Sequence, residues 1–222
     1  MTNMFCCFRN CFNGDLTAQV SVSKSNEPEI QLDNMNMGHE VVIVKNGRRL
    51  CGSGGALASA PLVQSKSYFE VKIQQGGVWS IGLATRQADL NKTKGGTDKE
   101  SWCLCSDNVV NHNDEEVATV IGIIVKNHEE TVNGDRTPLT STKTEEILLP
   151  QEGDTIGVAF DHVELNFYLN GKNLEVPVLN VKGTVYPALY VDDGAILDII
   201  LNNFSYGPPP GFEKIMIEQS LL

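Results

Sequence analysis

The sequence predicts an all-β sandwich, and three observations lead to this fold class. Residues 163–169 alternate between apolar and polar side chains, with the period of two that marks a strand with one buried face. Asn170-Gly171 follows directly, and Asn-Gly favours a type I′ hairpin turn because both central residues need positive φ. Seven or more short apolar segments are separated by Gly, Asn and Asp, the spacing expected of a sandwich.

The predicted strands begin after a charged turn near the start of the domain. Asn46-Gly47 lies between two apolar segments, so we interpret Lys45–Arg49 as a hairpin turn rather than a phosphate site. Residues 68–73 and 78–84 alternate strictly, which predicts one buried and one exposed face for each strand. In chain order the predicted strands are Val41–Val44, Tyr68–Ile73, Val78–Ala84, Ile156–Phe160, Val163–Leu169, Val185–Tyr190 and Ile196–Leu201.

The chain is expected to form one domain with an N-terminal extension. Its 222 residues, of which 41% are hydrophobic, are enough to bury one large core. We divide it into a Cys- and Phe-rich segment with a linker, 1–29, and a domain, 30–222, with a long insertion at about 109–149. Within this insertion Val117–Val125 is either an added edge strand or a buried plug, and the sequence leaves both open.

Charge and hydropathy exclude several classes of partner. The net charge of −11 and the pI near 4.8 oppose nucleic-acid binding, which depends on clusters of Lys and Arg. No apolar run reaches the ~18 residues of a membrane span, and the N-terminus lacks the apolar core of a signal peptide. We therefore expect a cytoplasmic monomer whose six cysteines stay unpaired in a reducing compartment.

The N-terminal cysteines have three readings, which the sequence does not separate. Cys6, Cys7 and Cys11 lie among three phenylalanines, and Cys7 and Cys11 are four residues apart. Acylation would use them as acceptors and would give peripheral membrane association, since two acyl chains anchor more stably than one. The alternatives are a plain tail and a metal site, although C-C-x-x-x-C supplies only three thiolates without CxxC pairing.

Five separated segments resemble the SPRY domain family over about Val41 to Ile217. In order they read YFEVKI, WSIGLATRQADL, SWCLCSDN, GDTIGVAFDHVELNFYLNGK and VYPALYVDDGAILDI. The resemblance implies a bent, concanavalin-like sandwich of two antiparallel sheets. It also implies a non-enzymatic module that binds proteins or peptides through loops at one edge.

Two loops match the binding edge of that family. They are Ala60–Lys66 and the turn Asp192-Asp193-Gly194. Two adjacent carboxylates could clamp an Arg or Lys of a basic peptide, with apolar contact from the first loop; solvated turn formation is the competing reading. The candidate peptide-binding residues are Leu62, Val63, Tyr190, Asp192, Asp193 and Gly194.

Other chemistries are weaker alternatives. A lectin-like glycan-binding domain remains the main one, and it needs an aromatic platform beside the acids, for which Tyr190 is the nearby residue. We expect no catalysis, cofactor or metal: Asp161-His162 suits a tight turn, and Cys51–Gly55 lacks the glycine spacing of a dinucleotide loop. Cys103 and Cys105 share a strand face and are expected to pack in the core.

Overall fold

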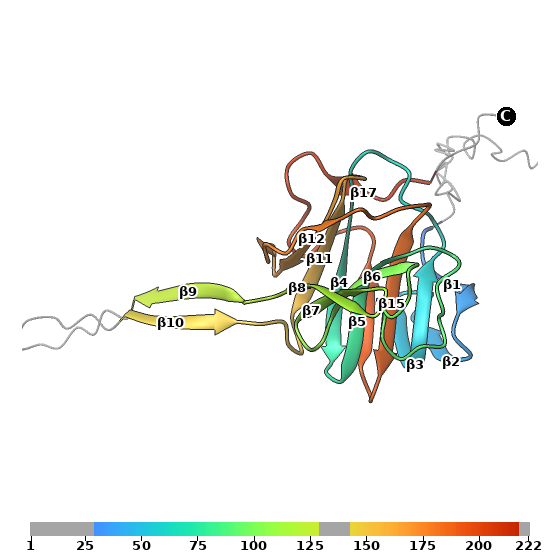
Figure 1. Cartoon of the computed structure of the whole chain (residues 1–222), viewed down its shortest axis with the longest axis horizontal. Helices are drawn as coiled ribbons and strands as arrows, with labels where there is room; N and C mark the ends of the chain where they lie inside the picture. Colours follow the sequence, from blue (N-terminus) through green and yellow to red (C-terminus); the bar gives the residue numbers. More distant parts are fainter. Residues whose placement is uncertain (1–28, 129–142, 218–222) are drawn as a thin grey trace, which may run out of the picture.

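The computed structural model describes residues 29–128 and 143–217, and all regular secondary structure in this part is β (Figure 1). Most strands join into one continuous hydrogen-bonded sheet that folds over on itself into two layers. Its pairs are antiparallel, apart from a short parallel pair at the C-terminal end. The all-β, bent sandwich prediction is therefore confirmed.

The first layer runs outward from the bend in the order β16, β4, β11, β12 and β13, with β2 pairing the start of β3. β17 and β14 add short pairs to β4 and β12. The strands are β2 (Glu40–Val44), β16 (Ile196–Ile200), β4 (Ser67–Gln75), β11 (Thr155–Phe160), β12 (Glu164–Leu169), β13 (Lys172–Asn173), β14 (Val178–Leu179) and β17 (Glu213–Lys214).

The second layer continues from the other half of β3 in the order β15, β5, β6, β7 and β8, with β1 on the outer side of β3. β15 is central, because it pairs with both β3 and β5. The strands are β1 (Leu32–Met37), β15 (Tyr186–Asp192), β5 (Val78–Ala84), β6 (Ser101–Cys105), β7 (Val109–His112) and β8 (Glu115–Thr119).

One strand, β3 (Arg49–Ala58), belongs to both layers. Its first half pairs with β2 and β16, and from Gly54 onward it pairs with β15. Gly52 and Gly54 sit at the crossing with φ of +96° and +120°, and a Cβ on Gly52 would lie 2.3 Å from the Glu40 carbonyl oxygen. These glycines allow the bend, so the glycine-rich stretch is structural.

The main core lies between the layers, but the outer faces of the central strands are also covered. Phe69, Val71 and Ile73 are buried inward as predicted. The prediction of an exposed second face is wrong, because Tyr68 and Glu70 are also fully buried. Segment 204–207 covers β4 there, and a second apolar cluster covers β5 and β15: Leu57, Ala84, Ala88, Cys103, Cys105, Tyr186, Ala188 and Tyr190.

The hairpin predictions hold, with one strand boundary corrected. Asn170 and Gly171 have φ of +49° and +79° between the paired residues Leu169 and Lys172, which confirms the type I′ turn. β12 begins at Glu164 rather than Val163, which is 67% exposed. The Asp161 carboxylate accepts the N–H groups of residues 163 and 164 and so fixes the turn before the strand.

The apolar run Val117–Val125 of the long insertion is neither a single edge strand nor a single buried plug, because the structure divides it among several elements. β8 is an edge strand on β7, Val120 is buried, and Gly122 has φ of +85°. The chain then leaves the sandwich in β9 (Ile123–His128) and returns in β10 (Lys143–Leu148). β9 and β10 pair only with each other among the described strands and form an arm that extends away from the body (Figure 1).

Candidate functional site

Asp193 and Gly194 form the turn between β15 and β16. The Ala195 N–H donates to the Asp192 carbonyl at 3.0 Å, and φ at the two central residues is +48° and +79°. Positive φ at both positions defines a type I′ turn, which Asp-Gly favours. Asp193 and Gly194 are exposed, and Asp192 is half-buried at the end of its strand.

A third carboxylate lies beside this turn. The backbone of Gly77 packs closely against the turn, since a Cβ on Gly77 would lie 2.5 Å from the Asp193 carbonyl oxygen. The neighbouring Gly76 N–H donates to the Glu152 carboxylate at 3.0 Å. We call Asp192, Asp193 and Glu152 the acidic end; none of them forms an ion pair with another described residue.

Loop Ala60–Lys66 is held against the body and exposes little apolar surface. The Leu62 side chain is only 3% exposed, and its N–H donates to the Val185 carbonyl at 2.9 Å. Val63 is 48% exposed. Gln64 ties the loop to the C-terminal segment by donating to the Lys214 carbonyl at 2.8 Å. Of the two apolar candidates, Val63 alone faces solvent.

The two predicted loops lie at opposite ends of the sandwich, which corrects the idea of one shared site. The Ala60–Lys66 loop leads into the start of β4, whereas the acidic turn adjoins the end of β4, where Gln75 pairs with Ile196. The nine residues of β4 extend over about 26 Å at ~3.3 Å per residue. Leu62 and Val63 therefore do not contact a short peptide held by Asp192 and Asp193.

Tyr190 points into the second cluster and not into solvent. Its side chain is 1% exposed, and burial raises its pKa well above the usual range. A ligand at the turn does not reach a ring in this position. The glycan alternative thereby lacks, at this turn, the aromatic platform on which it was based.

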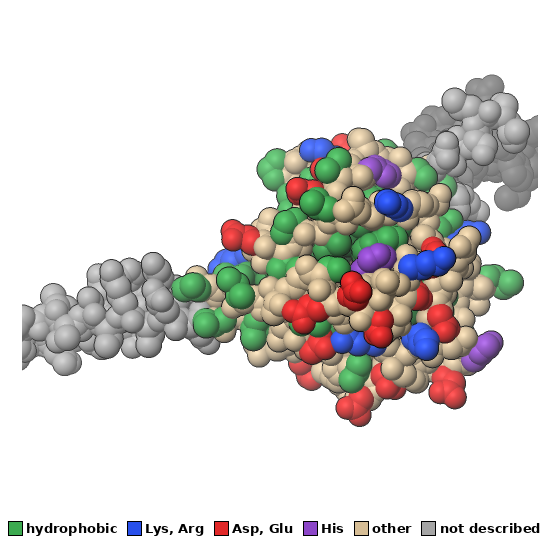
Figure 2. All heavy atoms as spheres, in the orientation of Figure 1, with side chains coloured by type: hydrophobic (Ala, Val, Ile, Leu, Met, Phe, Trp, Pro, Cys, Tyr) green, Lys and Arg blue, Asp and Glu red, His purple; other side chains and the backbone are tan. Residues whose placement is uncertain are grey.

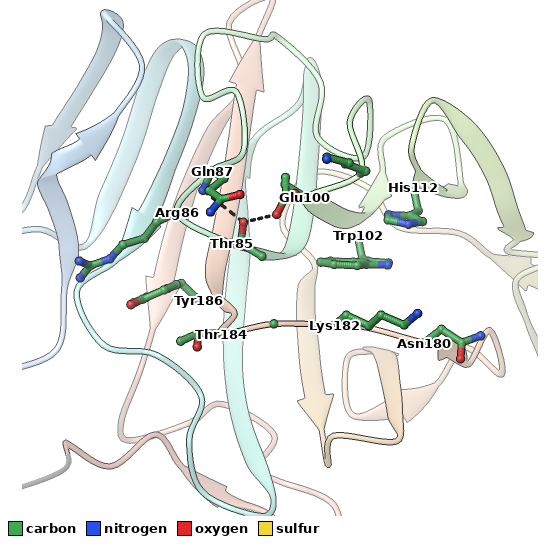
Figure 3. A pocket seen from close by; sticks show the side chains of 12 residues that line it. Thr85, Arg86, Gln87, Glu100, Trp102, His112, Asn180, Lys182, Thr184 and Tyr186 are labelled. Carbon is green, nitrogen blue, oxygen red and sulfur yellow. Dashed lines mark hydrogen bonds between the residues drawn. The ribbon is translucent and has the colours of Figure 1, made fainter.

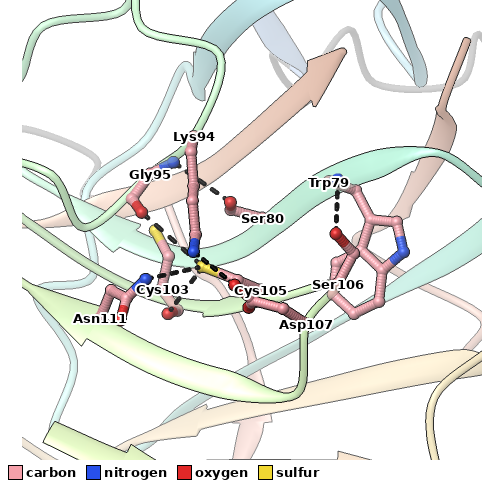
Figure 4. Close-up of polar contacts among 9 residues, drawn as sticks. All are labelled: Trp79, Ser80, Lys94, Gly95, Cys103, Cys105, Ser106, Asp107 and Asn111. Carbon is pink, nitrogen blue, oxygen red and sulfur yellow. Dashed lines mark hydrogen bonds and ion pairs between the residues drawn. The ribbon is translucent and has the colours of Figure 1, made fainter. Parts of the chain in front are cut away.

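The buried cysteines of β6 are core residues, as predicted (Figure 4). Burial raises the pKa of Cys103 strongly and that of Cys105 to about 11, so both remain neutral thiols near pH 7. The Cys105 sulfur accepts from the Asn111 amide at 3.7 Å. No group of three His, Cys, Asp or Glu residues within 29–128 and 143–217 is placed to hold a metal ion.

Cys6, Cys7 and Cys11 lie outside the described residues, so their predicted acylation stays a prediction. Among the residues that the structure describes, no helix is long and apolar enough to cross a membrane.

A cleft of about 620 Å³ lies at the other end of β5 and β15 (Figure 3). Its floor is formed by Trp102 of β6 and Tyr186 of β15, which are 4% and 7% exposed. Its rim carries residues of two connections, β5–β6 and β14–β15: Thr85, Arg86, Gln87, Lys99, Glu100, Asn180, Lys182, Gly183 and Thr184. Sequence reasoning missed this cleft, because no motif links two connections that lie far apart in the sequence.

The comparisons with known proteins place the chain in a family. Residues 66–204 match the model of the SPRY domain. The chain belongs to the SPRY domain family, as the sequence resemblance predicted.

Individual relatives agree over nearly the full length. SPRY domain-containing protein 7 of Homo sapiens is 48% identical over 220 residues, which cover 99% of this chain and 98% of the relative. The protein of the same name from Gallus gallus is also 48% identical, over 219 residues, with the same coverage.

Two solved structures share the fold at low sequence identity. The TRIM65 PSpry domain has a TM-score of 0.53 and 13% identity, over 77% of this chain and 88% of that chain. The SPRY domain of human HERC1 has a TM-score of 0.50 and 18% identity, over 76% of this chain and 96% of that chain. SPRY domains are generally non-enzymatic protein-interaction modules, and the two solved structures show that the bent sandwich described here is their fold.

Proposed function

We propose that this chain is a non-enzymatic interaction module that binds a basic segment of a partner protein at its acidic end. The observation that carries the proposal is the hairpin turn that presents Asp192 and Asp193 to solvent beside Glu152. A type I′ turn holds its backbone in a defined conformation, so little conformational entropy would be lost when a partner binds these carboxylates.

The charge of the acidic end supports a basic partner. Several other charged side chains are already paired, such as Asp198 with Arg49 and Asp107 with Lys94 at 2.6 Å. The acids of the turn have no such cation among the described residues. An Arg of a partner could donate two parallel hydrogen bonds to a carboxylate there, and the net charge of −11 would speed the encounter with a basic surface.

The proposal is tested by affinity capture and mass spectrometry from cells that express the protein. Wild type is compared with Asp192→Lys/Asp193→Lys and with Glu175→Lys/Glu213→Lys. The control pair consists of exposed acids on other turns and strands, and it changes the net charge by the same amount. Near-UV circular dichroism first confirms that all three proteins are folded.

A partner that is retained by wild type and by the control variant, but lost by the turn variant, supports the acidic end as the binding site. The interaction should weaken as salt is added. The Debye length is already only about 8 Å at physiological ionic strength, and more salt shortens it and weakens the attraction between exposed charges. Equal capture by all three proteins would refute the site. Loss with both variants would reduce the effect to overall charge.

Two further parts of the sequence hypothesis keep their own tests. Acylation of Cys6, Cys7 and Cys11 is proposed from the sequence pattern alone, and absence of hydroxylamine-sensitive labelling at these cysteines would contradict it. Retention of the protein on a glycan array would favour the lectin-like alternative over a protein partner.

A further inference from the structure

The cleft on Trp102 and Tyr186 is lined mainly by basic side chains among its charged residues, in contrast to the acidic end. It lies at the end of β5 where Ala84 pairs with Tyr186, whereas the acidic end lies where Val78 pairs with Asp192. The volume of about 620 Å³ falls within the range of roughly 300–1,000 Å³ typical of ligand sites. Figure 2 shows apolar side chains in the hollow at the middle of the displayed face and acidic side chains gathered below it.

The floor of the cleft is preorganised by contacts within the chain itself. The ring of His112 stacks on Trp102 with 4.6 Å between centroids and 10° between planes. Its Nδ1 lies 2.9 Å from the Ser101 carbonyl oxygen, and because a carbonyl only accepts, this contact requires the proton on Nδ1. Stacking and hydrogen bonding together hold both rings in place, so the base of the cleft is rigid.

The rim is fixed by a hydrogen-bonded corner. Thr85 donates its hydroxyl proton to the Glu100 carboxylate at 2.6 Å, and its hydroxyl oxygen accepts the Gln87 N–H at 3.2 Å (Figure 3). The backbone N–H of Thr85 also donates to the Glu100 carbonyl at 2.8 Å. Glu100, the one acid that lines the cleft, is thus already engaged by a neighbour.

Three cations surround this floor, two from the β5–β6 connection and one from the β14–β15 connection. Arg86, Lys99 and Lys182 line the cleft and are exposed, and none forms an ion pair with a described residue. The Arg86 guanidinium lies 4.9 Å from the centroid of the Tyr186 ring, which holds it at the wall. With Glu100 as the only lining acid, the formal charge of the lining is +2 (three cations minus one acid) in a protein of net charge −11.

We propose that this cleft binds an acidic peptide segment of a partner protein. Carboxylates of the peptide would pair with Lys99, Lys182 and Arg86, and an apolar side chain between them would lie on Trp102 and Tyr186. The argument is one of complementarity: the aromatic floor suits an apolar side chain, and the exposed ammonium and guanidinium groups suit carboxylates. A long polyanion is disfavoured, because the chain as a whole carries a net charge of −11.

The test is a titration of the ¹⁵N-labelled full chain, followed by NMR. The probe is a seven-residue peptide of Asp and Glu with a central Phe, and its Asn/Gln counterpart is the uncharged control. The chain has two tryptophans, so there are two indole N–H signals, which a Trp102→Phe variant assigns. We expect the acidic probe to shift the signal of Trp102, which lines the cleft, and to leave in place that of Trp79, which does not.

Charge reversal locates the binding. We expect Lys99→Glu/Lys182→Glu to weaken the acidic probe by about tenfold or more. The matched control, Lys92→Glu/Lys172→Glu, reverses two exposed lysines outside the cleft lining and should bind within about twofold of wild type. Arg86→Gln provides a milder second variant, which should also weaken binding.

Several results would overturn the proposal. A stationary Trp102 signal at saturating probe would do so, as would equal weakening by both lysine pairs, which would reduce the effect to net charge. Equal binding of the Asn/Gln peptide would remove the carboxylate preference. Displacement of the acidic probe by millimolar inorganic phosphate would assign the cleft to phosphate instead of to peptide carboxylates.

Discussion

At the scale of single residues, Glu70 is the least expected side chain. It is fully buried in β4, and its carboxylate accepts the Tyr68 hydroxyl at 3.0 Å and the N–H groups of Ser205, Tyr206 and Gly207 at 2.7, 3.0 and 3.0 Å. A buried carboxylate is tolerated only when such donors replace water. Glu70 therefore holds segment 204–207 against the outer face of the sheet.

We predict that Glu70→Gln destabilises the fold. The amide would replace one acceptor oxygen by an NH₂ group that faces backbone donors, which leaves at least one donor without a partner. The expected loss in the free energy of unfolding is about 2–4 kcal/mol. Urea denaturation measures it, with exposed Glu175→Gln as the control. Equal stability of the two variants would show that the carboxylate is dispensable.

Asp198 predicts a pH-dependent contribution to stability. Burial alone would raise its pKa, but hydrogen bonds from Arg49 at 2.5 and 2.8 Å and from Lys45 at 3.2 Å outweigh burial and lower the pKa below its ordinary 3.8. Because the pKa is lowered in the folded state, the stabilisation is fully present above the ordinary value. It is lost as pH falls below that value and through the lower pKa of the folded protein.

The variant Asp198→Asn should therefore be less stable than wild type at pH 7, by about 1 kcal/mol. The difference should shrink once the pH falls below about 4, where the Asp198 carboxylate of the unfolded chain begins to protonate. Thermal unfolding of both proteins at a series of pH values measures the difference. A gap that is constant down to the acid limit would contradict the ion pair as its origin.

Residue-level predictions succeeded where local pattern decides and failed where distant segments decide. Alternation identified Phe69, Val71 and Ile73 as inward-facing. It could not show that segment 204–207 covers Glu70, since that contact spans 135 residues in sequence. The burial of Tyr190 has the same cause, because cluster partners from other segments fill the face that alternation leaves outward.

At the scale of elements, the C-terminal strand β17 closes one end of the sandwich. It runs parallel to β4, with Glu213 opposite Ser67, after a proline-rich segment that cannot donate to a ladder. Ile215 follows the strand and is 3% exposed, whereas Ile217 is 38% exposed. Phe212, which lies before β17, is half-buried.

This asymmetry gives a matched pair of variants. Ile215→Asp should lower the free energy of unfolding by roughly 3 kcal/mol or more, because it places a carboxylate in an apolar site. Ile217→Asp should change it by no more than about 1 kcal/mol, since the side chain is already partly in water. Urea denaturation compares the two variants. Equal effects would mean that the segment does not pack as described.

Element prediction was most accurate where turns carry a clear signal. Asn170-Gly171 fixed the ends of β12 and β13, and the strand at 78–84 has the bounds that alternation gave it. The insertion was harder, because Val117–Val125 is one apolar run that the structure divides between an edge strand, a buried residue and the arm. The chain changes direction at Gly122, which has positive φ, but a glycine in the sequence does not by itself predict that its φ is positive.

At the scale of the whole molecule, the acidic end and the cleft on Trp102 and Tyr186 differ in charge and in shape: one is an exposed acidic turn, the other a hollow with basic side chains at its rim. The acidic end and the aromatic cleft terminate the same strands, β5 and β15, at opposite ends. The acidic turn could be predicted because its residues are contiguous in sequence. The cleft could not, because β6, the segment at 180–184 and the corner at Thr85 and Glu100 meet only after folding.

The shared strand β3 determines how this molecule comes apart. Its two halves hydrogen-bond to strands of different layers. Neither layer can therefore unfold completely without disturbing a strand that is still hydrogen-bonded in the other layer. Independent melting of one layer would break ladder bonds at the bend and expose the core between the layers. The protein should therefore unfold in one cooperative transition, and a ligand at either end would protect amide hydrogens throughout the sandwich from exchange with solvent.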